Sequence, residues 1–309
     1  MPPRTGVALS SYTRFGLGGP ADCFLETPEE AEFVAALRET PPPVLVLGGG
    51  TNLIVSDSGF RGAVLRYTGH AIWSQGGEVH AQAGAVLQDL VDHALDHALQ
   101  GLETLAGIPG WVGAAVYGNA GAYGHSISER VRGVRFFDGA QVRDLDHTQC
   151  EFRYRASIFQ RRKDWIILSV ELALEPGDYV GLRKIAGDIL KIRNGKFPPS
   201  MKCAGSIFKN LLAAALPPDV LARVPGRVIR EGKVPAAFFL EQAGAKSLSN
   251  GGIHVAGYHA NLIYNDGAGT AAQLCELIDE LKDRVRRAFG LELEEEVQYV
   301  GFPDRGAGI

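Results

Sequence analysis

The chain has 309 residues, more than a single hydrophobic core usually serves, so two or three packed units are expected. The formal net charge of −4, from 31 basic and 35 acidic residues without a basic block, argues against a dedicated nucleic-acid surface. The chain shows no secretory pattern at its start and no stretch apolar enough to cross a bilayer, which predicts a cytoplasmic protein without a membrane partner.

Hydrophobic periodicity and turn residues predict strands and helices that alternate along the chain. The first helix is expected to begin at Pro28, because Thr27 stands three residues before Glu30 in the spacing of a capping box. Gly101 suits a left-handed cap after the second helix. The expected elements are a helix over 28–39, strands over 44–47, 53–55 and up to about 65, a helix over 87–98, strands over 134–137 and 165–174, a helix over 179–193, a short helix over 235–244, a strand over 259–265 and a helix over 270–290.

Cysteine and histidine residues give no pattern typical of a metal site. The four cysteines, Cys23, Cys150, Cys203 and Cys275, are scattered and are predicted to be reduced thiols. Cys203 allows a reactive nucleophile, but a small buried thiol is favoured. His93 and His97 lie one helical turn apart among aspartates, so a solvated helix face is favoured over a metal pair.

Glycine is abundant, with 39 residues, and two glycine-rich segments stand out. "GGGTN" at 48–52 follows a strand but is neither a P-loop nor a dinucleotide-fold turn, because no G-K-[ST] follows it and it leads into another strand. Its amides can still form a nest for a pyrophosphate. The uncharged stretch "GLETLAGIPGWVGAAVYGNAGAYG" at 101–124 is consistent either with amides that reach a large planar or phosphorylated ligand or with a tightly packed turn.

The segment "CAGSIFKN" at 203–210 carries a serine with two interpretations. Ser206 is either a turn residue that leads into a strand or a hydroxyl that donates a proton to a ligand. Just before it, "NGKFPPS" at 194–200 has the glycine and paired prolines of a domain boundary.

Five segments, in order and spacing, resemble the UDP-N-acetylenolpyruvoylglucosamine reductases, the MurB family. They are "LGGGTNLIVSDSGF", "GIPGWVGAAVYGNAGAYG", "YRASIF", "AGSIFKN" and "LEEEVQYVG". The resemblance implies an α+β protein with a two-subdomain FAD-binding fold of the vanillyl-alcohol-oxidase (PCMH) type and an α/β substrate-binding domain. It implies subdomain 1 over 1–68 with 296–309 packing back on it, subdomain 2 over 69–195 and the substrate domain over 196–295.

The family reaction is the NADPH-dependent reduction of UDP-N-acetyl-3-O-(1-carboxyvinyl)-glucosamine to UDP-N-acetylmuramate through non-covalent FAD, a step of peptidoglycan precursor synthesis. By matching motifs, the resemblance places the catalytic arginine at Arg155, the proton donor at Ser206 and the glutamate at Glu296. Without the resemblance, a surface ion pair is the favoured interpretation of Arg155, and a solvated position in a glutamate run is the favoured interpretation of Glu296. The resemblance implies no metal, and it leaves the oligomeric state open, with a monomer compatible.

The resemblance also implies binding residues. The flavin is expected against Gly48, Gly49, Gly50, Thr51, Asn52, Gly113, Ala114, Asn119 and Gly121, and the substrate against Lys196 and Asn210. Solvent exposure of Lys196 and a turn role for Asn210 remain alternatives. Ala114 replaces a frequent glycine, and Leu211 replaces a frequent proline.

Ser206 follows Arg155 by only 51 positions, which leaves no room for the tyrosine loop of the longer family form, so this chain resembles the shorter form. A flavin-dependent sugar or lactone oxidase of the same fold and a non-catalytic sugar-nucleotide or flavin-binding protein remain alternative functions.

Overall fold

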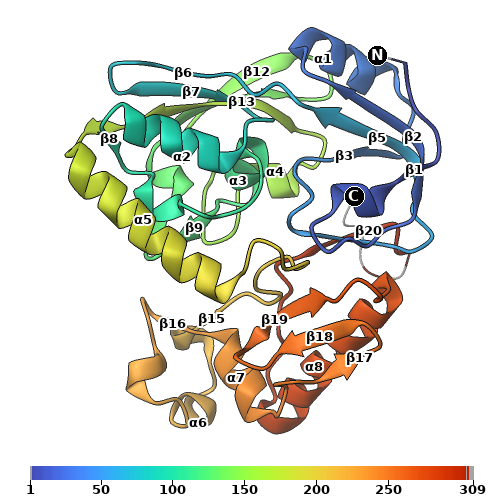
Figure 1. The fold of residues 1–309 in the computed structure, drawn as a ribbon, viewed down its shortest axis with the longest axis vertical. Coiled ribbons are helices and arrows are strands. Elements are labelled where there is room, and N and C mark those ends of the chain that lie inside the picture. Colours follow the sequence, from blue (N-terminus) through green and yellow to red (C-terminus); the bar gives the residue numbers. More distant parts are fainter. Residues whose placement is uncertain (1, 304, 306–309) are drawn as a thin grey trace.

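The computed structural model describes residues 2–303 and 305. Figure 1 shows an upper part formed by the blue, green and yellow segments together with the red strand β20, and a lower part formed by the orange segments and the remaining red ones. The α-helices are α1 (Glu30–Glu39), α2 (Leu87–Asp96), α3 (Val112–Tyr117), α4 (Ile158–Arg161), α5 (Tyr179–Lys196), α6 (Pro218–Leu221), α7 (Ala236–Gln242) and α8 (Ala271–Phe289). The strands are β1 (Val7–Ala8), β2 (Pro20–Thr27), β3 (Val44–Val46), β4 (Leu53–Val55), β5 (Phe60–Tyr67), β6 (Ile72–Gln75), β7 (Glu78–Gln82), β8 (Leu99–Gln100), β9 (Gly121–Ala122), β10 (His125–Ser126), β11 (Val131–Phe137), β12 (Val142–Asp146), β13 (Ile166–Ala173), β14 (Glu175–Pro176), β15 (Leu211–Leu212), β16 (Lys233–Val234), β17 (Ser249–Asn250), β18 (Ile253–Ala256), β19 (His259–Asn265) and β20 (Gln298–Val300).

The N-terminal segment forms a sheet in the order β1-β2-β5-β3. Strands β2 and β3 both pair in parallel with β5, and α1 makes the connection between β2 and β3 that a parallel arrangement requires. The C-terminal strand β20 pairs in parallel with β4, with Gln298 opposite Leu53. Figure 1 accordingly shows β20 beside the blue strands, although the lower part of the chain separates them in sequence.

The middle segment forms an antiparallel sheet in the order β12-β11-β13-β7-β6. Helices α2, α3 and α5 lie below this sheet in Figure 1. Leu90 of α2, Val116 of α3 and Leu168 of β13 are fully buried in one apolar core. The sheet and its helices therefore form one packed unit, in which α3 lies against β13.

The last third of the chain packs α7 and α8 against the antiparallel sheet β17-β18-β19. Leu274, Ile278 and Leu281 of α8 are fully buried there, which confirms that the apolar stripe of this helix is core packing. Thr270 closes a capping box at the start of α8 and Gly290 ends the helix with φ +66°. The apolar stripe and the two capping residues were therefore sufficient to predict α8 from the sequence.

Helix α5 continues to Lys196, beyond its predicted end at Arg193. Two further predicted helix boundaries, one in α1 and one in α2, are also wrong. Helix α1 begins at Glu30, because Thr27 is the last residue of β2 and its hydroxyl donates to Glu32 Oε2 at 2.7 Å. Helix α2 ends at Asp96 and Gly101 does not cap it, because the chain turns at Ala98, with φ +53°, into strand β8. In both places strand pairing in the sheet determines the boundary and overrides the local helix signals.

The four cysteines are mostly buried, and His93 and His97 contact each other. Cys150, Cys203 and Cys275 are buried and all four cysteines are free thiols. The rings of His93 and His97 stack with centroids 4.2 Å apart. Within residues 2–303 and 305, no three potential metal-ligating side chains gather and no helix is long and apolar enough to span a membrane.

Candidate active site

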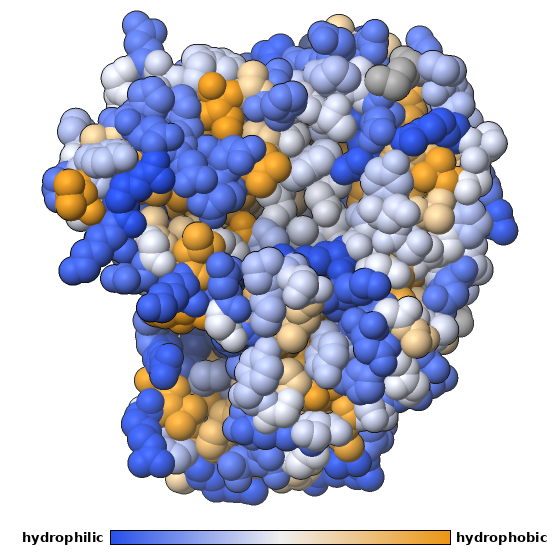
Figure 2. Space-filling view, viewed as in Figure 1, coloured by the Kyte–Doolittle hydropathy of each residue, from blue (hydrophilic) through white to orange (hydrophobic). Residues whose placement is uncertain are grey.

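Two adjoining cavities, of about 700 and 780 Å³, lie where the three parts of the chain meet. Figure 2 shows the surface indented between the upper and lower parts of the molecule. Each volume falls in the range of about 300–1,000 Å³ found for ligand sites. The residues that line both cavities are Thr51, Asn52, Trp111, Ala114, Gly118, Arg155 and Glu296.

The glycine turn between β3 and β4 forms one wall of the 700 Å³ cavity. Gly50 has φ +62°, and a Cβ there would lie 1.8 Å from the carbonyl oxygen of Tyr12, so only glycine fits. A Cβ on Gly49 would lie 3.2 Å from the Trp111 ring. Asn52 closes the turn by donating from Nδ2 to the carbonyl oxygen of Glu296 at 2.8 Å. The turn therefore keeps a tight backbone curve against the cavity.

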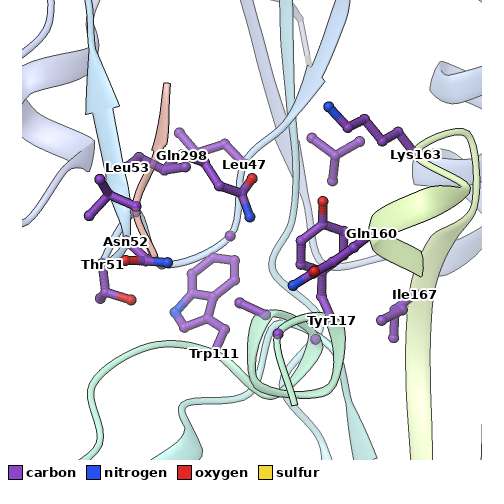
Figure 3. Close-up of a pocket in the computed structure, with 18 of the residues that line it drawn as sticks. Leu47, Thr51, Asn52, Leu53, Trp111, Tyr117, Gln160, Lys163, Ile167 and Gln298 are labelled. Atoms are coloured by element: carbon purple, nitrogen blue, oxygen red, sulfur yellow. The ribbon is translucent and has the colours of Figure 1, made fainter. Parts of the chain in front are cut away.

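Helix α3 and the residues before it form the opposite wall. Figure 3 shows the Trp111 ring next to Asn52 of the glycine turn, and Tyr117 farther from the turn, on the same side of the cavity as Gln160 of α4. A Cβ on Gly113 would lie 2.8 Å from the Ala83 side chain, so this glycine allows α3 to pack closely on the chain after β7. The small residues of 101–124 thus allow α3 to pack closely on its neighbours, and they also line the two cavities.

These walls fit a dinucleotide cofactor such as FAD. The glycine turn offers main-chain amides, whereas Phe33, Val46 and Ile167 contribute apolar side chains to the same cavity. The amides suit a diphosphate and the apolar side chains a planar ring.

Arg155 projects into the junction of the two cavities from a tight turn with φ +54°. Its Nη2 donates to the Gly121 carbonyl at 2.9 Å and its Nη1 to the Asn119 carbonyl at 3.4 Å. Its Nε lies 2.7 Å from Glu296 Oε1, an ion pair in which the N–H is not aligned with the oxygen. The guanidinium is therefore held from three sides, with about 23% of the side chain exposed.

Glu296 reaches the same point from the segment before β20. Its backbone N–H donates to the Ile207 carbonyl at 2.7 Å, and Lys209 N–H donates to the Glu294 carbonyl at 2.9 Å. Burial raises the pKa of the Glu296 carboxyl, and the charge of Arg155 opposes this shift. The carboxyl is thus desolvated and depends on Arg155 for its main countercharge.

Ser206 lies in the 780 Å³ cavity with Arg155 and Glu296. Gly205, with φ +80°, turns the chain immediately before it, and Ser206 then pairs as an antiparallel bridge with Leu262 of β19. Asn261 holds the next residues: its Oδ1 accepts from Phe208 N–H and its Nδ2 donates to the Phe208 carbonyl, both at 2.9 Å. The serine thus sits on a segment fixed by two sets of backbone contacts.

Further positive side chains gather in the 780 Å³ cavity. Arg193, Lys196 and Arg230 line it, and burial, with the charges of the two arginines, lowers the pKa of Lys196. Burial also lowers the pKa of the neighbouring His259 to about 4, with a contribution from Lys196. An anionic ligand would relieve this mutual repulsion. The sequence analysis missed the arginines, although Arg193 stands one helical turn before Lys196 in α5.

Every predicted site residue lines one of the two cavities. Gly48, Gly49, Gly50, Thr51, Asn52, Gly113 and Ala114 line the 700 Å³ cavity, and Asn119, Gly121, Arg155, Lys196, Ser206, Asn210 and Glu296 line the 780 Å³ cavity. Several of them also have protein partners for their side chains, among them Asn52, Arg155 and Glu296, whose contacts are given above, and Asn210 and Asn119. The Asn210 Oδ1 accepts from Ala236 N–H at the start of α7, at 3.3 Å, and the Asn119 amide bonds to neighbouring backbone.

Family models match both parts of the chain. A model of an FAD binding domain matches residues 23–141, and one of the UDP-N-acetylenolpyruvoylglucosamine reductase C-terminal domain matches residues 197–300. The fold and the paired cavities thus define a flavin-dependent oxidoreductase with a separate substrate-binding part.

Whole-chain relatives identify the family. The chain is 66% identical over 296 residues to the UDP-N-acetylenolpyruvoylglucosamine reductase of Solibacter usitatus, with 95% of each chain covered, and 36% identical over 300 residues to that of Rubrobacter xylanophilus, with 96% of this chain and 94% of the relative covered. The crystal structure of the enzyme from Thermus caldophilus superposes with a TM-score of 0.75 at 29% identity, covering 95% of this chain and 97% of the other. The chain belongs to the UDP-N-acetylenolpyruvoylglucosamine reductase family.

Proposed function

We propose that this protein uses NADPH and FAD to reduce UDP-N-acetyl-3-O-(1-carboxyvinyl)-glucosamine to UDP-N-acetylmuramate in peptidoglycan precursor synthesis. The observation that carries the proposal is the convergence of Arg155, Ser206 and Glu296 from three segments beside the glycine turn. Bound FAD supplies the redox chemistry, taking a hydride from NADPH and passing it to the methylene carbon of the enolpyruvyl group. The identity of 66% to a named reductase supports this enzyme over an oxidase or a non-catalytic binding protein.

Arg155 and Glu296 act on the charge that this hydride addition creates. Negative charge spreads from the carbon next to the ether oxygen into the substrate carboxylate. The Arg155 guanidinium offers a planar fork of donors to that charge, and Glu296 orients the guanidinium through the 2.7 Å ion pair. Because the guanidinium is already fixed, it does not need to reorganise when the charge develops.

Ser206 completes the reaction by donating its proton to that carbon. A serine hydroxyl is a weak acid in water, but an enolate-like carbon is a strong base, so placement matters more than acidity. The two backbone contacts around Phe208 and the bridge to Leu262 support such placement.

The binding residues follow from the two cavities. The turn Gly48–Gly49–Gly50–Thr51–Asn52 with Gly113, Ala114, Gly121 and the backbone at Asn119 would hold FAD non-covalently, and Lys196 and Asn210 would hold the sugar nucleotide. Arg193 and Arg230 support an anionic diphosphate near Lys196. We assign 1–68 with 296–309 to subdomain 1, 69–195 to subdomain 2 and 196–295 to the substrate domain; residues 304 and 306–309 lie outside the described residues. A cytoplasmic location fits these small-molecule ligands.

Replacement of the serine tests the proposal. Ser206→Ala should fold, bind FAD and accept electrons from NADPH at nearly the normal rate, because hydride transfer to the flavin does not use this hydroxyl. Reoxidation by the enolpyruvyl substrate should slow by at least ~10²-fold, the effect expected for a lost general acid. Stopped-flow flavin absorbance measures the two half-reactions separately.

Two further variants make this test specific. Ser206→Cys should recover part of the rate, because a thiol occupies the same place and is the stronger acid. Ser249→Ala, on the exposed face of β17, should change neither half-reaction. If Ser206→Ala reoxidises within a few-fold of the unmodified protein, Ser206 is a structural turn residue only.

A further inference from the structure

Asn119 has an unusual setting for a residue beside a ligand cavity. It follows α3 with φ +44°, a left-handed conformation, and only 6% of its surface is exposed. Its Nδ2 donates to the Arg153 carbonyl at 2.9 Å and its Oδ1 accepts from Ser128 N–H at 3.3 Å. Both ends of the amide are therefore occupied by backbone groups of the protein.

The Arg153 carbonyl belongs to the turn that carries Arg155. Within this turn Arg153 N–H donates to the Ala156 carbonyl at 3.0 Å, and Ala156 N–H donates to the Arg153 carbonyl at 3.1 Å. Arg155 sits inside the turn with φ +54°, a conformation that a side-chain-bearing residue adopts only when its surroundings enforce it. The Asn119 amide ties this turn to the end of α3.

Asn119 also contacts the guanidinium itself. Its backbone carbonyl accepts from Arg155 Nη1 at 3.4 Å, and the Gly121 carbonyl two residues later accepts from Nη2 at 2.9 Å. One short segment thus fixes both the backbone that carries Arg155 and the direction of its side chain. Arg155 and Asn119 both have a left-handed backbone conformation, so their relative placement depends on these few contacts.

We propose that Asn119 is the positioning residue of Arg155: its side-chain amide holds the 153–156 turn so that the guanidinium meets the developing negative charge. This inference rests on the proposed function of Arg155 and gives the Asn119 side chain a role apart from FAD. A displacement of a catalytic group by about 1 Å can cost roughly 10²-fold in rate. The effect of Asn119 should therefore appear in the half-reaction that uses Arg155, and nowhere else.

Asn119→Gly tests this role, because glycine adopts positive φ without strain and removes only the amide. We expect FAD content and reduction by NADPH close to those of the unmodified protein, and reoxidation by the enolpyruvyl substrate slower by roughly 10- to 100-fold. In the Arg155→Ala background the same change should slow reoxidation no further, because there is no guanidinium left to position. An undiminished effect of Asn119→Gly in that background would overturn the inference.

Other variants separate the remaining outcomes. Asn119→Asp keeps the size and the acceptor but lacks the amide donor, so it should reproduce the defect if Asn119→Gly does not fold. Asn265→Asp, at a buried asparagine in β19 that donates to the Phe15 carbonyl, should cost stability without this half-reaction defect. Loss of FAD with a normal reoxidation rate after reconstitution would make Asn119 a cofactor ligand instead. Normal reoxidation in Arg155→Ala itself would refute the proposed function, not the positioning step alone.

Discussion

The ion pair of Arg155 and Glu296 joins two residues that are 141 positions apart and belong to different parts of the fold. Each side chain is about three-quarters buried, so each charge has lost most of its water. Removal of either partner leaves the other charge uncompensated in the cavity, which is more costly than removal of both. The pair is therefore expected to behave as one unit in catalysis.

Mutation of the pair should reveal this coupling. Arg155→Ala and Glu296→Ala should each slow reoxidation of the flavin by the enolpyruvyl substrate more than reduction by NADPH. The double variant should lose less than the sum of the two losses in activation free energy, because residues that act as a unit are not additive. Stopped-flow measurement of both half-reactions for the four proteins gives the coupling energy. Strict additivity, or a defect confined to reduction by NADPH, would favour a mere surface pair.

His259 provides a pH-dependent contribution to stability. Its pKa is lowered to about 4 in the folded protein, chiefly by burial, whereas an unfolded histidine titrates near 6.5. As the pH falls from 6.5 to 4, the unfolded chain gains a proton that the folded protein does not, so the free energy of unfolding decreases. Above pH 6.5 the residue is neutral in both states and this contribution is constant.

His259→Gln should therefore flatten the acid limb of the stability profile. Urea unfolding between pH 8 and pH 4 should show a smaller loss of stability below pH 6.5 for the variant than for the unmodified protein, with a constant difference between them above that pH. Parallel profiles over the whole range would mean that His259 titrates in the folded protein as it does in the unfolded chain.

At the scale of elements, the turn between β3 and β4 is limited by space as well as by backbone conformation. Gly50→Ala would place a Cβ 1.8 Å from the Tyr12 carbonyl oxygen at φ +62°, so the turn must move. Because the same turn lines the proposed cofactor cavity, FAD affinity should fall by at least ~10-fold, as expected when an amide nest is distorted. Fluorescence titration of the FAD-free protein measures this loss.

Gly6 offers a matched control for that substitution. Its φ is +64°, nearly that of Gly50, but a Cβ on it would meet nothing within 4 Å. Gly6→Ala should therefore lower stability through its left-handed backbone alone and leave FAD affinity unchanged. Equal effects of the two substitutions on FAD affinity would show that the glycine turn does not hold the cofactor.

At the scale of the whole molecule, Asp57 connects the N-terminal part to the lower part. Its Oδ1 accepts from Ala271 N–H at 2.9 Å and its Oδ2 from Ala272 N–H at 3.0 Å, at the start of α8. A carboxylate there satisfies free amides and complements the positive end of the helix dipole. One side chain from the loop after β4 thus caps the longest helix of another unit.

Asp57→Ala should lower the free energy of unfolding by about 1 kcal/mol, the usual effect of a lost N-terminal cap. Asp22→Ala is a suitable control, because Asp22 makes an exposed ion pair with Arg61, and such pairs contribute little. Denaturant unfolding of the three proteins measures both effects. A loss no larger than that of Asp22→Ala would show that the Thr270 capping box alone is sufficient for α8.

The sequence by itself determined the elements whose signals are local and mutually consistent. The apolar stripe, the Thr270 cap and Gly290 together define α8, and the strand-like segment "HANLIYN" predicts β19. The glycine turn could also be predicted from the sequence. Its residue types exclude the common phosphate-binding motifs and still indicate that the backbone approaches a ligand closely. The candidate site residues came from a resemblance over several motifs, since single residues such as Arg155 or Glu296 are ambiguous in isolation.

Only the tertiary structure decided which of these residues meet and what their side chains do. The pairing of 207–209 with 294–296 brings Ser206 and Glu296 together, and no local pattern encodes that contact. The observed start of α1 and end of α2 likewise differ from the predicted ones, because sheet hydrogen bonds outweigh a capping preference. The resemblance implied that Asn119 lies at the cofactor, and only the structure shows that its side chain contacts the Arg155 turn and Ser128. Such roles depend on distances between segments far apart in the chain, and these distances are set only when the three units pack.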